Sequence, residues 1–193
     1  MIETFLRGIL YGILFFIALV VVITIIKVKI KKAEKAAKEE AERQRQFEQK
    51  REWLTRQVQI FNDCVDLISR SENLDVVARR YNALIEITNK LMPYTQKDLE
   101  EYGIHIKRSF SAVKSELIRN KEDIFEDAIY RAHRAWVEKI TTMKTQVGKE
   151  HSLDTFEERT SEIIIQYELP SECLEYLSTL CYNTRGEIAE ELL

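Results

Sequence analysis

The sequence feature that most constrains this chain is an uninterrupted apolar run, GILYGILFFIALVVVITII, at residues 8–26. Its 19 residues include no charged side chain. As a helix rising about 1.5 Å per residue, they would span roughly 28 Å, close to the hydrocarbon thickness of a bilayer. A cleaved signal peptide would start with basic residues and end with small ones, whereas this segment starts MIE and ends IIK. We therefore predict a retained transmembrane helix rather than a signal peptide or a buried core helix.

Basic residues are distributed unequally around this run. Only Arg7 precedes it, whereas six lysines follow it closely. Because basic residues are retained on the cytoplasmic side, we expect the N-terminus outside and the C-terminal domain in the cytoplasm. The lysines could also hold the chain against the anionic lipid headgroups of the bilayer, although their effect on topology would account for them equally well. These candidate topology and lipid-binding residues are Lys27, Lys29, Lys31, Lys32, Lys35 and Lys38.

Gly8 and Gly12 form a GxxxG pair at the start of the apolar run. This spacing lets two membrane helices approach closely, so the pair is a candidate packing site for a homo-oligomer. Pairs of this kind are also common by chance in apolar segments.

Charge divides the remainder of the chain into a basic and an acidic part. Residues 27–56 include 11 basic and 6 acidic side chains, a net charge of +5. Residues 57–193 include 17 basic and 25 acidic side chains, a net charge of −8. An acidic domain binds nucleic acid poorly, so we expect no nucleic-acid partner, and the basic part favours anionic lipid.

The segment after the lysines is rich in Ala, Glu, Lys, Gln and Arg, all of which favour helix. The apolar residues Ala33, Ala37 and Ala41 are followed at helical spacing by the polar residues Gln44 and Glu48. We therefore expect no coiled-coil seam within this segment. We predict a solvated helical stem that continues the membrane helix. The predicted organisation is an anchor at 1–30, a charged stem at 31–52 and a soluble helical-bundle domain at 53–193.

The domain reads as all-α, with about five to six helices. Five glycines and two prolines in the whole chain are few, which favours long helices over a sheet. Apolar residues recur at spacings of three and four from Leu54 onward, and the strongest such stripe runs from Phe125 and Ile129 to Met143 and Val147. We expect Ser71 or Asn73 to cap the next helix, and Thr95 with Asp98 to form a capping box before the short turn that follows. The further expected elements are helices at about 74–92, a short turn at 95–102 ending at Gly103, one or two helices over 104–147 closed by Gly148, a helix from 154 or 155 to 167, and a last helix from 170 or 171 onward.

No motif of catalysis or metal binding is present in the sequence. The histidines, His105, His133 and His151, do not form HExxH, and no clustered glycines suggest a phosphate loop. Cys173 and Cys181 are too far apart on one helix for a disulfide, and three reduced cysteines suit a cytosolic domain. We predict no catalytic residue, no metal site and no cofactor, although an unrecognised site in the bundle would make the protein a membrane-bound enzyme.

The leading hypothesis is a single-pass membrane protein whose cytosolic bundle binds another protein, as a scaffold, adaptor or regulator. The layout resembles that of bitopic bacterial proteins with a cytoplasmic helical domain, in architecture only and without a shared motif. The alternative is a phage- or prophage-type envelope protein that acts in lysis or exclusion. The two hypotheses differ in the side of the membrane on which the domain is expected.

Overall fold

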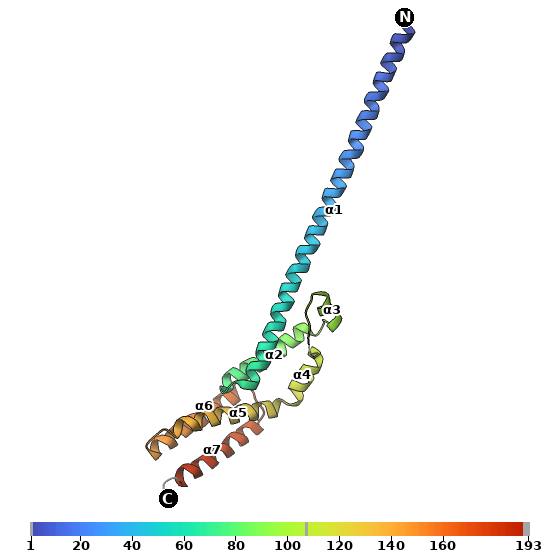
Figure 1. The fold of residues 1–193 in the computed structure, drawn as a ribbon. Helices are drawn as coiled ribbons and strands as arrows, with labels where there is room; N and C mark the ends of the chain where they lie inside the picture. Colours follow the sequence, from blue (N-terminus) through green and yellow to red (C-terminus); the bar gives the residue numbers. More distant parts are fainter. Residues whose placement is uncertain (1, 107, 191–193) are drawn as a thin grey trace. The chain divides into compact units, whose positions relative to one another are not determined.

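A computed structural model describes the backbone of residues 2–106 and 108–190, and the side chains of the same residues except 2–22 and 25. The described residues form seven α-helices and no strand, which confirms the predicted all-α class (Figure 1). The chain divides into two compact units, Met1–Trp53 and Leu54–Leu193.

The first unit consists of one helical segment. It is part of α1 (Ile2–Arg70), whose last residues belong to the second unit. All described side chains of residues 23–53 are exposed. Among the described residues, no helix is both long and apolar enough to span a bilayer. The run at 8–26 lies almost entirely outside the described side chains, so the transmembrane helix gains no support here and remains a prediction from sequence.

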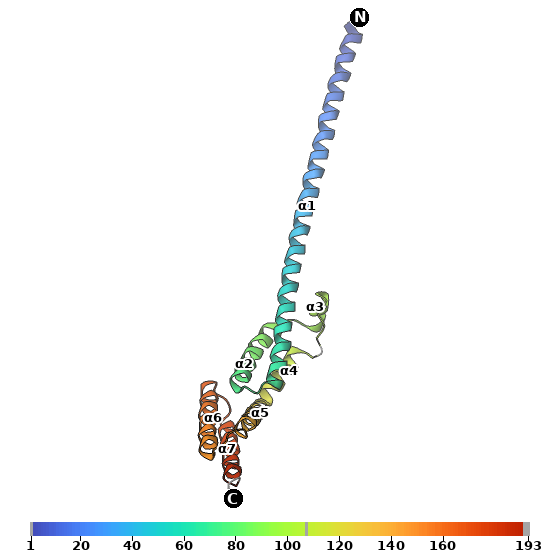
Figure 2. The same ribbon diagram turned by 60° about the vertical axis from the view of Figure 1, so that its left-hand side comes forward.

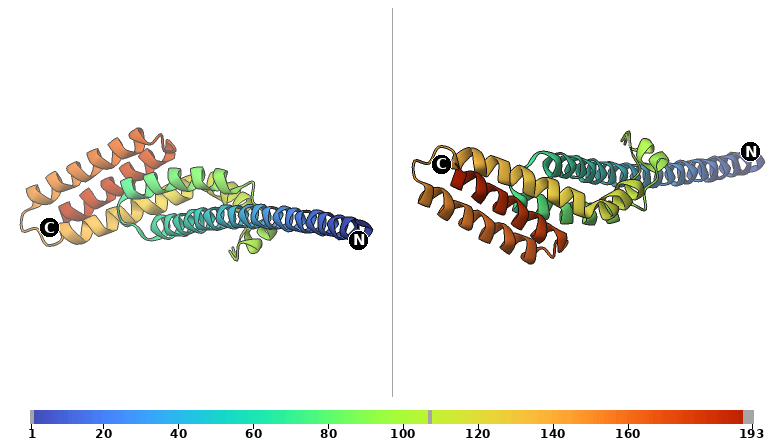
Figure 3. Two further views of the ribbon diagram at one scale, coloured as in Figure 1. Left: turned by 90° about the horizontal axis from the view of Figure 1, so that it is seen from above. Right: turned by 90° about the horizontal axis from the view of Figure 1, so that it is seen from below.

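The second unit combines the end of α1 with six further helices. Helices α5, α6 and α7 lie side by side in both views of Figure 3, and α2 packs against α4 and α5. Helix α3 lies apart from α6 and α7 (Figure 2). The helices are α2 (Leu74–Leu91), α3 (Gln96–Glu101), α4 (Phe110–Arg119), α5 (Lys121–Ile140), α6 (Gln146–Gln166) and α7 (Glu172–Glu190).

The core of this unit lies on the apolar helix faces that the periodicity predicts. Leu54, Val58, Phe61 and Ile68 of α1 are buried, and Val65 of the same stripe remains 40% exposed. One contiguous apolar cluster connects these α1 residues with side chains from every other helix of the unit. The main stabilisation therefore comes from long-range burial of amphipathic faces.

Several helix ends form as local sequence chemistry predicts. The Asn73 side chain accepts hydrogen bonds from the backbone amides of Asp75 and Val76, and so caps α2. Thr95 and Asp98 form a reciprocal capping box at the start of α3. The backbone of Gly103 adopts a φ of 71°, the left-handed conformation that glycine accepts most readily.

The expected long helix ending at Gly148 is wrong. Helix α5 ends at Ile140, and α6 begins at Gln146, earlier than the expected start at 154 or 155. The Thr145 side chain accepts a hydrogen bond from the Gly148 amide and thereby starts a new helix. As a result Val147, expected on a buried stripe, is 76% exposed.

The remaining undecided boundaries are also defined by the structure. Asn120 separates α4 from α5, so the segment expected as one or two helices contains two helices and the start of a third. Helix α7 continues through Gly186 to Glu190, and a side chain at residue 186 would meet nothing within 4 Å.

Candidate functional site

A groove in the second unit is the best candidate for a binding site. It has a volume of about 450 Å³ and lies between the end of α1, the α3–α4 connection and α4. Its apolar lining comes from side chains of α1 and α4, together with Ile106, and its polar lining includes an amide, a carboxylate, an imidazole and a guanidinium. The residues are Val58, Phe61, Asn62, Val65, Asp66, His105, Ile106, Arg108 and Val113.

Local contacts hold the walls of this groove in place. The ring of Phe61 meets that of Phe110 edge-on, with centroids 5.3 Å apart. The Ile104 amide donates to the Leu99 carbonyl at 2.9 Å, which folds the α3–α4 connection back on α3. Arg108 forms an ion pair with Glu116 of α4. An apolar surface with a mixed polar margin is the chemistry of a peptide- or helix-docking groove.

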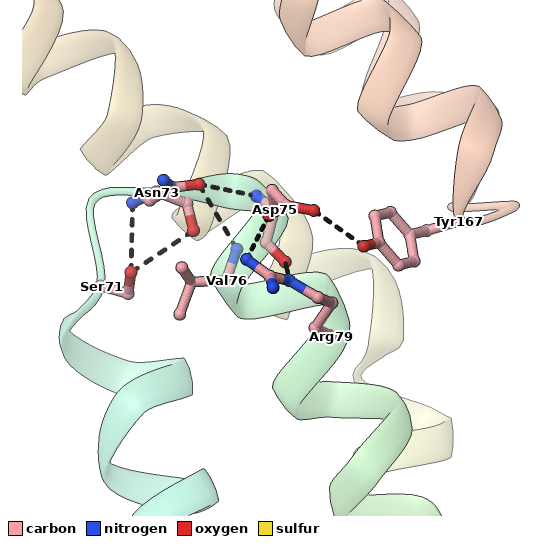
Figure 4. Close-up of polar contacts among 6 residues, drawn as sticks. All are labelled: Ser71, Asn73, Asp75, Val76, Arg79 and Tyr167. Atoms are coloured by element: carbon pink, nitrogen blue, oxygen red, sulfur yellow. Dashed lines mark hydrogen bonds and ion pairs between the residues drawn. The ribbon is translucent and has the colours of Figure 1, made fainter.

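A polar junction connects the start of α2 with the end of α6 (Figure 4). One carboxylate oxygen of Asp75 accepts a hydrogen bond from the Tyr167 hydroxyl at 2.7 Å, and the other forms an ion pair with Arg79. This hydrogen bond is the main cause of a raised pKa of Tyr167. Because each member has a partner within the chain, the junction reads as a structural connection between two helices.

His133 is the one histidine of the described residues that is buried. Its Nε2 lies 2.9 Å from the Thr184 hydroxyl oxygen, and that hydroxyl donates to the Leu180 carbonyl at 3.0 Å. With the hydroxyl hydrogen engaged there, the arrangement fits a tautomer whose Nε2–H donates to Thr184. The ring also lies 5.8 Å from that of Phe156 between centroids. His133 therefore ties α5 to α6 and α7.

Burial lowers the pKa of His133, and the nearby Glu187 carboxylate opposes this shift. In the unfolded chain His133 has an ordinary histidine pKa of about 6.5. As the pH falls, His133 is therefore protonated at a higher pH in the unfolded chain than in the folded chain. We expect the free energy of unfolding to fall as pH decreases from about 8 to about 5, and to fall less in a His133→Gln variant. Glutamine retains an N–H for Thr184 but does not titrate. Chemical denaturation at several pH values measures the difference, and equal pH dependence in both proteins would refute it.

The cysteines have the properties of core residues. Cys64, Cys173 and Cys181 are all buried and unbridged. Burial, aided by neighbouring carboxylates, raises the pKa of Cys173 to about 11 and that of Cys181 to about 12. Thiols held protonated in this way are poor nucleophiles.

The six predicted lysines all lie exposed on the part of α1 in the first unit. Lys35 lies 3.8 Å from the Glu39 carboxylate, one turn along the helix. Gly8 and Gly12 lie outside the residues with described side chains, so their packing role stays a prediction. The lysines Lys27, Lys29, Lys31, Lys32, Lys35 and Lys38 likewise remain predicted topology and lipid residues.

The three histidines lie on different elements. His105 belongs to the α3–α4 connection, His133 to α5 and His151 to α6. Across the described part of the chain, no group of three or more His, Cys, Asp or Glu side chains could hold a metal ion.

The groove was not predicted from sequence. The α1 residues of the groove belong to an apolar stripe that the sequence predicts to be buried along its whole length. Of that stripe, Val65 is exposed, and it lines the groove. His105 and Arg108 reach it from a connection whose path local patterns do not define. Comparison of the chain with family models, with curated proteins and with solved structures finds no match.

Proposed function

We propose that this protein is a single-pass, membrane-anchored scaffold, adaptor or regulator whose helical domain binds another protein at the cytoplasmic face. The observation that carries the binding role is the groove in the second unit, with apolar side chains of α1 and α4 and a polar margin. Its volume of about 450 Å³ would accommodate a few apolar side chains of a partner helix or peptide.

The membrane part of the proposal comes from the sequence. The uncharged run at 8–26 has the length of a bilayer span, and six lysines follow it within 12 residues, Lys27 to Lys38. Together they favour a domain that faces the cytoplasm and a stem that lies close to anionic headgroups.

We expect the full-length protein to stay with membranes after extraction at alkaline pH. A Phe16→Asp and Leu19→Asp double variant should move to the soluble fraction, because each charge at the centre of a span costs roughly 2.5–3.5 kcal/mol. A reporter fused after Leu193 should be active only in the cytoplasm. Extraction of the unmodified protein would refute the anchor, and a reporter active outside would favour the envelope-protein alternative.

The groove is tested separately by affinity capture from detergent-solubilised membranes. A stoichiometric partner should be recovered with the wild type and lost with Val65→Lys, which places a charge against the apolar lining. Ile165→Lys is the matched control, because Ile165 is also exposed but lies on α6, away from the groove. Recovery of the same partner with Val65→Lys, or of the protein alone in every case, would contradict the docking role.

A further inference from the structure

The part of α1 in the first unit has a seven-residue repeat. Beginning at Ile23, apolar residues alternate at spacings of three and four through Ala37. In a coiled coil these are the positions named a and d, which form the seam between two helices. The same register then reaches Glu40, Gln44 and Phe47. The apolar seam positions are Ile23, Ile26, Ile30, Ala33, Ala37 and Phe47.

The first three isoleucines of this face are exposed. Ile23, Ile26 and Ile30 are 44%, 50% and 52% exposed. The stem considered from Ala33 onward has too few apolar positions for a seam. Beginning at Ile23, the seam gains isoleucines at positions a (Ile23, Ile30) and d (Ile26). Ile23 and Ile26 belong to the predicted membrane span, where van der Waals packing between the two helices would hold them together.

The charges beside the seam indicate which occupant fits it. In a parallel pair, each residue at position g faces the residue five positions later at e of the partner. Here Lys29 would face Glu34 of the second copy, and Arg43 would face Glu48. Between these two pairs, Ala36 would face Ala41, so no like charges meet.

The opposite orientation is disfavoured by the same residues. An antiparallel pair brings the g positions of the two helices together. In the first unit these positions are Lys29, Ala36, Arg43 and Lys50, so basic side chains would oppose one another. Charge complementarity is therefore satisfied by a second copy in parallel, in-register orientation.

We propose that the first unit pairs with a second copy of this chain as a short parallel coiled coil over residues 23–47. Glu40 and Gln44 place polar groups in two seam layers and weaken the pair. The proposal rests on the proposed function in one respect: anchors in one bilayer hold two copies parallel and raise their effective concentration. This pairing assigns the stem a role in self-association and leaves the groove of each domain for another protein.

Cysteine cross-linking of the full-length protein in membranes tests the pairing. The native cysteines are buried, so a single introduced cysteine reports on the stem. Identical a or d positions of a parallel pair lie close enough for a disulfide, whereas f positions lie on the outer faces. We expect Ala33→Cys and Ala37→Cys to give about fivefold or more disulfide-linked dimer than the matched Glu42→Cys variant at position f.

Charge reversal provides a second measurement in the Ala37→Cys background. Arg43→Glu should reduce the cross-linked dimer, and the addition of Glu48→Arg should restore it. Equal cross-linking at all three cysteine positions, or none at any, would overturn the proposal.

The topology reporter is read on the same samples. A dimer pattern without membrane insertion would support the pairing while the anchor fails, and insertion without the pattern would overturn the pairing while the anchor stands.

Discussion

Replacement of Phe125 by alanine is expected to lower the free energy of unfolding by about 3–5 kcal/mol. Phe125 is fully buried in α5, and its ring lies 5.1 Å from that of Tyr81 in α2. The Tyr81 hydroxyl in turn donates to the Leu117 carbonyl of α4 at 2.9 Å. Loss of the Phe125 ring would therefore leave a cavity where three helices meet. Chemical denaturation of the full-length protein in mild detergent, followed by circular dichroism, measures the effect.

Tyr130→Ala is the matched control, because Tyr130 is an aromatic residue of the same helix that is 47% exposed. Its removal should change the free energy of unfolding by less than about 1 kcal/mol. A Phe125→Ala variant as stable as Tyr130→Ala would mean that α5 does not pack against α2 as described.

The second large effect is expected at Arg131, where alanine should cost about 2–3 kcal/mol. Its Nη2 donates to the Ile68 carbonyl at 2.7 Å, and its Nε donates to the Ser71 carbonyl at 3.2 Å. Carbonyl groups at a helix C-terminus lack partners within the helix, so the guanidinium satisfies them and favours the negative end of the α1 dipole. Arg131 also pairs with Asp127 on its own helix.

Arg131→Lys separates the shape of the side chain from its charge. An ammonium cannot reproduce the planar fork of a guanidinium, so lysine should recover less than half of the loss. Arg134→Ala is the control, since Arg134 is exposed and its 3.7 Å contact with Glu138 is a surface ion pair worth under about 1 kcal/mol. Hydrogen exchange should accelerate at the end of α1 in Arg131→Ala alone. Unchanged exchange there would contradict the capping role.

The core on α5 was largely predictable, and its end was not. Phe125 and Ile129 lie on the predicted stripe and are fully buried. The stripe continues in sequence to Met143 and Val147, yet the helix ends at Ile140. The spacing of apolar residues predicts which face of a helix is buried, but it does not predict where the helix ends. The Thr145 cap competes with that continuation, and the spacing of apolar residues carries no sign of it.

His133 and Arg131 show a different limit. Neither residue has a sequence neighbour that explains its role, because their partners Thr184 and Ile68 are 51 and 63 positions away. A polar residue near an apolar stripe is ordinarily solvated, so burial of His133 becomes evident only when α6 and α7 cover it.

By itself, the sequence determined the all-α class, a cap at Ser71 or Asn73, the cap at Thr95, and the buried face that begins at Leu54, because helix propensity, capping and periodicity act over a few residues. The transmembrane span and its lysine flank likewise are predictions of sequence alone. Tertiary structure decided where α5 stops, which member of a stripe stays exposed, and how a groove forms beside Val65. These depend on which helices come to lie together, and that choice is made by burial between residues far apart in the chain.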